Sequence, residues 1–107
     1  MNNQDVVRIN EWLNCWKGAT ASFNHYTTTH NRFVLEVGFY EKNQSLGISF
    51  VFCVFIAGPT HWTNCDLKCC LWVQQDGTCG YEVRDDIVGF VVRGTDTIVF
   101  GDGEWHP

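Results

Sequence analysis

The first part of the chain carries apolar residues at helical spacing. Four of them recur at intervals of three, four and three residues, which places them in one stripe on a helix surface. Asn2 or Asn3 can cap the start of this helix, and Gly18 can end it. The pattern therefore predicts a helix over residues 4–16 whose apolar stripe packs on a sheet. The stripe consists of Val6, Ile9, Leu13 and Trp16.

After Gly18 the spacing of apolar residues changes to two, which is typical of β-strands. Asp76-Gly77 predicts a tight hairpin turn, and Gly58-Pro59 predicts the end of a strand. Because the segment 46–57 is apolar at nearly every position, we expect it to be a central strand covered on both faces. The predicted strands cover residues 19–27, 33–40, 46–57, 66–75, 79–83, 87–93 and 97–100.

These elements predict a mainly β fold of the α+β class. One N-terminal helix would pack on about seven antiparallel strands, arranged as a curled sheet, a sandwich or a barrel. The chain has no internal repeat and no linker, so we expect one domain over residues 1–107 with a short C-terminal tail. The pattern leaves the strand order open.

The start of the chain is polar and has no basic segment followed by an apolar one, so we expect no signal peptide. The longest apolar stretch, residues 48–57, is too short to span a bilayer as a helix. We therefore expect a cytoplasmic protein that does not insert into membranes. In that compartment its six cysteines would stay mostly reduced.

Charge is unevenly distributed along the chain. Residues 1–75 contain five acidic and five basic side chains, whereas residues 76–107 contain seven acidic and two basic ones, which account for the whole net charge of −5. Such a surface repels phosphate backbones and favours a basic protein partner. The predicted partner-binding residues are these acids together with a neighbouring tryptophan: Asp76, Glu82, Asp85, Asp86, Asp96, Asp102, Glu104 and Trp105.

Two alternative sites use other residues. The loop His61-Trp62-Thr63-Asn64 combines an aromatic ring with polar groups, which is typical of sites for carbohydrates or other small ligands. A zinc-type metal site could draw on His61, Cys65, Cys69 and Cys79. Because Cys69 lies inside a predicted strand, we favour buried thiols over metal ligands and expect no cofactor.

No known catalytic motif is present: the chain lacks a Gly-x-Ser-x-Gly elbow, a phosphate-binding loop and a dinucleotide fingerprint. The small size and acidic balance are similar to those of bacterial immunity and inhibitor proteins, a likeness of class and not of motif. We therefore expect a small, acidic, non-catalytic protein-binding module that engages a basic partner. An exposed sheet edge would also allow a homodimer.

Overall fold

The computed structural model describes residues 1–101. The predicted helix is confirmed as α1, which spans Asn3–Cys15. The Asn2 side chain accepts a hydrogen bond from the Asp5 N–H, and the Asp5 side chain accepts one from the Asn2 N–H, a reciprocal cap that satisfies two amides at the helix start. After the helix, Gly18 adopts a φ of +89°, a conformation that glycine reaches without strain.

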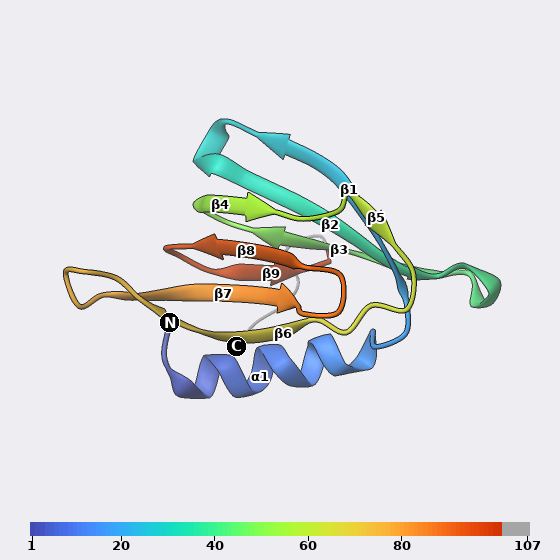
Figure 1. Ribbon diagram of the computed structural model, residues 1–107, viewed down its shortest axis with the longest axis horizontal. Helices are drawn as coiled ribbons and strands as arrows, with labels where there is room; N and C mark the ends of the chain where they lie inside the picture. The colour runs from blue at the N-terminus through green and yellow to red at the C-terminus, as the bar shows by residue number, and fades with distance from the viewer. Residues whose placement is uncertain (102–107) are drawn as a thin grey trace.

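The strands form two antiparallel sheets, which confirms the mainly β prediction and selects a layered arrangement over a closed barrel for residues 1–101 (Figure 1). The five-stranded sheet has the order β5-β1-β2-β3-β9, and the four-stranded sheet has the order β4-β8-β7-β6. The strands are β1 Thr20–Thr27, β2 Arg32–Phe39, β3 Gln44–Phe50, β4 Cys53–Ala57, β5 His61–Trp62, β6 Lys68–Val73, β7 Cys79–Asp85, β8 Phe90–Gly94 and β9 Ile98–Phe100. Two short 3-10 turns, η1 Thr29–Asn31 and η2 Tyr40–Lys42, connect β1 to β2 and β2 to β3.

The prediction of one central strand over 46–57 is wrong. The chain turns at Phe52, whose φ is +51°, and passes from β3 in one sheet to β4 in the other. The hydroxyl of buried Tyr81 donates to the carbonyl of Val51 at 3.0 Å, and the Phe52 N–H donates to the His30 carbonyl at 2.9 Å, so this corner is firmly bonded. A continuous apolar run cannot reveal such a corner, because both strands of the run are rich in apolar residues.

The strand count also exceeds the expected seven, since residues 1–101 contain nine strands. One extra strand comes from the division of 46–57, and another is β5, which lies in a segment predicted to be a loop. The last two strands follow each other along the chain but pair in different sheets, β8 with β4 and β7, and β9 with β3. The first part of the predicted strand 87–93 is a turn, in which Ile87 is 80% exposed.

The hydrophobic core lies between the two sheets and is rich in aromatic rings. Phe33 and Phe50 of the five-stranded sheet stack with centroids 5.6 Å apart, and Phe50 meets Tyr81 of the four-stranded sheet at 5.9 Å. Ile9 and Leu13 of α1 complete this core, as the helical stripe predicts. Full burial of one such side chain contributes about 1.5–3 kcal/mol.

Helix α1 lies along β6, at one edge of the four-stranded sheet (Figure 1). Within residues 1–101, no helix is both long and apolar enough to cross a membrane.

Candidate functional site

The four-stranded sheet has two edge strands, of which one is covered by another element and the other is not. At the β6 edge, the side-chain amide of Asn10 in α1 pairs with the backbone of Cys69. The Asn10 Nδ2 donates to the Cys69 carbonyl at 2.9 Å, and the Cys69 N–H donates to Asn10 Oδ1 at 2.8 Å. This side chain takes the place that a neighbouring strand would occupy, so the helix closes this edge.

The opposite edge is strand β4, and it is open. Among residues 1–101, no strand pairs with β4 on the side away from β8. Its sequence, Cys53-Val54-Phe55-Ile56-Ala57, carries no charge. Val54, Phe55 and Ile56 are 53%, 45% and 37% exposed. Long, uncharged and apolar edges are ones that proteins usually protect, because they add a further strand readily.

The two edge strands of the five-stranded sheet described for residues 1–101 are shorter than β4. β5 has two residues and β9 has three, which offer few backbone groups for pairing. The register of β4 with β8 shifts between Cys53 and Phe55, so Val54 is an extra residue on the edge. The regular run Phe55–Ala57 continues beyond it. β4 is therefore the most accessible long edge of the described fold.

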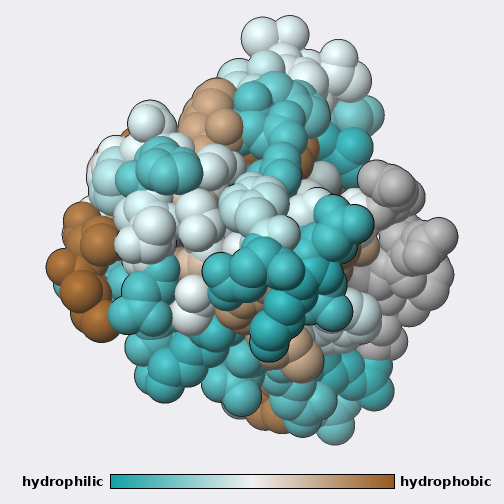
Figure 2. Space-filling model, turned by 90° about the vertical axis from the view of Figure 1, so that its right-hand side faces the viewer, coloured by the Kyte–Doolittle hydropathy of each residue, from teal (hydrophilic) through white to brown (hydrophobic). Residues whose placement is uncertain are grey.

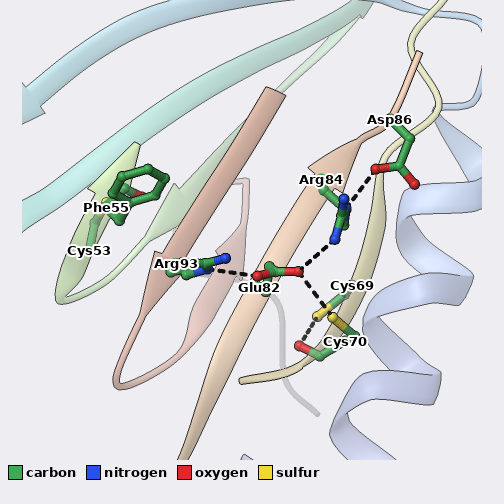
Figure 3. Close-up of polar contacts among 8 residues, drawn as sticks. All are labelled: Cys53, Phe55, Cys69, Cys70, Glu82, Arg84, Asp86 and Arg93. Atoms are coloured by element: carbon green, nitrogen blue, oxygen red, sulfur yellow. Dashed lines mark hydrogen bonds and ion pairs between the residues drawn. The ribbon is translucent and has the colours of Figure 1, made fainter. Parts of the chain in front are cut away.

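The outer face of the sheet beside β4 carries a network of side-chain contacts. The Arg93 guanidinium on β8 lies between two aromatic rings, 5.4 Å from the centroid of Phe55 and 5.8 Å from that of Trp72. Its Nε also donates to Glu82 Oε2 at 2.6 Å (Figure 3). Cation–π contacts of this kind contribute about 0.5–2 kcal/mol each. They hold the Phe55 ring in place next to the open edge.

Glu82 is the centre of this polar cluster, with Arg93 on one side and Arg84 and Cys70 on the other (Figure 3). Arg84 Nη1 lies 3.2 Å from Glu82 Oε1, and Arg84 Nε lies 2.6 Å from Asp86 Oδ1. Burial favours a raised pKa for Glu82, but the hydrogen bond and charge of Arg93 outweigh burial and lower the pKa below its usual value. On this face, the negative charges of Glu82 and Asp86 are therefore balanced by the positive charges of Arg84 and Arg93.

The acids predicted to bind a partner are distributed differently from expectation. Glu82 is 8% exposed and Asp85 is 1% exposed, so neither presents a free charge at the surface. Asp85 accepts from Trp62 Nε1 at 2.9 Å, the Asp66 N–H at 2.8 Å and the Ile87 N–H at 3.2 Å. This carboxylate is a buried hydrogen-bond acceptor at the end of β7 that connects β5, the segment before β6 and the β7–β8 turn.

The remaining described acids, Asp76, Asp86 and Asp96, are exposed in turns. The β6–β7 and β8–β9 turns, which contain Asp76 and Asp96, lie at one end of the four-stranded sheet, and the β7–β8 turn, which contains Asp86, lies at the other end of that sheet (Figure 1). The three acids therefore do not form one continuous patch. Asp102, Glu104 and Trp105 lie outside the described residues.

The predicted ligand loop contains a buried tryptophan. Trp62 is 6% exposed, and its ring centroid lies 4.7 Å from that of Phe90 in the core. Because the ring is buried, it offers no stacking surface to a ligand, and its indole N–H is used by Asp85. His61, Thr63 and Asn64 are exposed, and His61 Nδ1 lies 2.8 Å from Ser22 Oγ.

The proposed metal ligands do not converge. Across residues 1–101, no three His, Cys, Asp or Glu side chains are placed to share a metal ion. Cys65 Sγ donates to the Trp16 carbonyl at 3.3 Å, and burial, followed by the charge of Asp85, raises the pKa of Cys65 to about 11. Burial likewise raises the pKa of Cys69 to about 12. Both side chains are therefore protonated thiols at neutral pH and poor nucleophiles.

Sequence reasoning missed the Phe55–Arg93–Trp72 sandwich and the closing role of Asn10. The sequence held a partial signal, because residues at alternate positions of a strand share a face. Such pairs are Cys70 and Trp72 in one strand and Glu82 and Arg84 in the next, and Arg93 lies in a third strand. Their pairing across strands depends on register, which the sequence pattern does not give.

The end of the molecule opposite the β6–β7 hairpin is mainly hydrophilic (Figure 2). The connections on that side contain three exposed apolar side chains, Tyr40 in η2 and Ile87 and Val88 in the β7–β8 turn. Neither connection presents a sheet edge, whereas the exposed apolar side chains of β4 lie on one, so we take β4 as the candidate binding surface. Comparison of the chain with models of protein families, with curated proteins and with solved structures found no match.

Proposed function

We propose that this chain is a non-catalytic protein-binding module that receives an extended segment of a partner protein as an additional strand beside β4. The single observation that carries the proposal is the contrast between the two edges of the four-stranded sheet. Asn10 closes the β6 edge, whereas β4 is open, uncharged and apolar. Strand addition takes affinity from backbone hydrogen bonds and specificity from alternate side chains.

The chemistry of the partner segment follows from this edge. Alternate apolar side chains would cover Val54, Phe55 and Ile56, which are otherwise exposed. The ordered ring of Phe55 offers such a side chain a fixed surface, so little entropy is lost at that contact.

Charge favours a basic partner over a second copy of the chain. Two copies with a net charge of −5 each repel one another. The β8–β9 turn adjoins the start of β4, because the Thr95 N–H donates to the Phe52 carbonyl at 3.1 Å, and the next residue is exposed Asp96. A basic residue at that end of the partner segment would be attracted to it. These features agree with an inhibitor- or immunity-type role against a basic protein.

The test uses random peptides displayed on phage and selected against the purified chain. We expect the selected peptides to alternate apolar residues and to carry a basic flank. Val54→Lys should weaken their binding by about tenfold, which corresponds to about 1.4 kcal/mol. Val73→Lys is the matched control, since Val73 is 65% exposed at the opposite edge strand, and it should leave binding unchanged.

Hydrogen exchange gives the location of binding. Bound peptide should slow amide exchange in residues 53–57 more than in any other strand. Failure to select any peptide, equal binding by the two variants, or protection confined to another part of the chain would contradict the proposal. A stable dimer of the chain at low ionic strength that Val54→Lys dissociates would identify a second copy as the occupant instead.

A further inference from the structure

The outer face of the five-stranded sheet contains a polar groove of about 560 Å³ that the proposed function does not use. It lies on strands β1, β2 and β3, whereas β4 belongs to the other sheet. Its volume is within the usual range for small-molecule sites. Most of its lining is polar, and the principal side chains are Asn24, His25, Arg32, Glu36, Ser45 and Ser49.

A chain of hydrogen bonds fixes one side of the groove. Asn24 Nδ2 donates to Glu36 Oε2 at 3.3 Å, and the Tyr40 hydroxyl donates to Glu36 Oε1 at 3.0 Å. His25 Nδ1 lies 2.7 Å from Asn24 Oδ1. The carboxylate is thus oriented by two donors and keeps lone pairs for a third. Such orientation lowers the entropy lost when a ligand binds.

The backbone of β1 is adapted to this arrangement. Its register with β2 shifts between Phe23 and His25, so Asn24 is an extra residue at the shift. Irregularities of this type re-aim side chains and are common beside binding sites.

The floor of the groove contains a polar group without a partner. Ser49 is 7% exposed, and its hydroxyl makes no hydrogen bond to any residue within 1–101. Leaving a buried hydroxyl unpaired costs about 1–3 kcal/mol unless a ligand or water satisfies it. Neighbouring Gly47 has no side chain that would fill the groove, and a Cβ at this position would contact Val34 Cγ1 at 3.4 Å.

The charges of the groove select a ligand class. Arg32 and Glu36 lie on the same face of β2, four residues apart, and they form no ion pair with each other. Among residues 1–101, Arg32 is the basic and Glu36 the acidic side chain that line the groove, so their charges balance and neither a strong anion nor a strong cation is favoured. An apolar ligand would leave the Ser49 hydroxyl unpaired and would desolvate both charges.

We propose that this groove binds a neutral, polyhydroxylated molecule, a mono- or disaccharide. Each sugar hydroxyl both donates and accepts, so it can donate to Glu36, accept from Arg32 and pair with Ser49. This site differs from the predicted ligand loop, because it lies on other residues and no tryptophan within residues 1–101 lines it.

The experiment is saturation-transfer NMR with a panel of neutral mono- and disaccharides at millimolar concentration, followed by calorimetry on the sugars that bind. Glu36→Gln removes the charge but keeps the shape, and we expect it to weaken binding by about tenfold. Ser49→Ala should weaken binding severalfold. Ser22→Ala is the matched control, since Ser22 lies on β1, contacts His61 and does not line the groove, and it should leave binding unchanged.

Several results would overturn the proposal. They are no saccharide binding at millimolar concentration, equal binding by wild type and Glu36→Gln, or preference for a charged sugar over its neutral counterpart. Gly47→Val, which fills the floor, serves as a second blocking variant, with the melting temperature of each variant as the check on folding. Val54→Lys should leave saccharide binding intact, so failure at β4 and failure at the groove are distinguishable.

Discussion

At the scale of single residues, the clearest feature is that buried carboxylates have partners. Asp85 receives an indole N–H and two backbone N–H groups, whereas Glu82 receives Arg93, Arg84 and the Cys70 thiol. Unpaired buried charges are strongly destabilising, so both carboxylates are tied to the fold by these bonds. Two acids of the chain are therefore structural, although by sequence they resemble surface charges.

The pairing of Glu82 predicts a dependence of stability on pH. Burial alone raises the pKa of Glu82, but the Arg93 hydrogen bond and charge lower it below the usual value of 4.5. A carboxylate whose pKa is lower in the folded state than in the unfolded state stabilises the fold at pH above its unfolded-state pKa. This stabilisation is lost as pH falls through the folded-state pKa. We expect wild type to be more stable than Glu82→Gln at pH 7 and this advantage to disappear on the acid side of pH 4.5.

The measurement is urea unfolding of both proteins from neutral to acidic pH. Comparing the two proteins cancels the titration of the other carboxylates. An advantage of wild type that grows on acidification would show that the Arg93 pairing does not govern this group.

At the scale of elements, α1 acts as a cover as well as a core helix. Ile9 and Leu13 are buried in the core, while Asn10, between them, bonds the edge of β6. Trp12 and Trp16 stack on Phe100 and Phe39 of the five-stranded sheet, with centroids 5.4 and 5.7 Å apart. The helix therefore contacts both sheets along one side of the core.

Replacing Asn10 tests this double role. Asn10→Leu removes both hydrogen bonds to Cys69 and leaves the backbone N–H and carbonyl of Cys69 unpaired. We expect this loss to lower the free energy of unfolding by about 1–3 kcal/mol. Asn14→Leu is the control, because Asn14 is exposed one turn later on the same helix, and its effect should stay within about 0.5 kcal/mol. Denaturant titration measures both, and equal stability of the two variants would contradict the edge-closing role.

At the scale of the whole molecule, the net charge and the open β4 edge have opposite effects on self-association. The open β4 edge favours association of any two copies, and the net charge of −5 opposes it. Exposed acids at both ends of the four-stranded sheet keep this repulsion effective in any antiparallel pairing of two β4 strands. The balance leaves the edge available for a partner of opposite charge.

This balance predicts salt-dependent self-association. At low ionic strength the chain should sediment as a monomer. Raising salt to about 1 M shortens the screening length to about 3 Å and should increase the dimer fraction. Val54→Lys should suppress that increase, whereas Val73→Lys should not. Sedimentation equilibrium measures the fractions, and a stable dimer at low salt would refute the repulsive balance.

The residue patterns predicted the elements better than their pairing. The stripe of Val6, Ile9 and Leu13 and the cap at Asn2 predicted α1 within one residue at each end, since helical spacing and capping are local. The Asp76-Gly77 turn likewise predicted the hairpin between β6 and β7. The apolar run 46–57 did not predict its own division into β3 and β4, because that division depends on a corner whose hydrogen-bond partners are far away in the chain.

The candidate sites were less predictable, because they depend on contacts between distant strands. The charge count gave the acidic balance but could not tell exposed Asp96 from buried Asp85, which gains its partners from β5 and from the segment before β6. Likewise, Trp62 differs from a surface aromatic only through its contact with Phe90. The polar groove has only a weak sequence signal, the alternation Ser45-Gly47-Ser49 on β3.

The sequence by itself determined the helix, the β class and the net charge, because these follow from spacing and composition over short windows. Only the tertiary structure decided which strand stays open, which carboxylates are neutralised and which hydroxyl is left unpaired. Those properties depend on strand register and on sheet order, and both are set by contacts between residues that are remote along the chain.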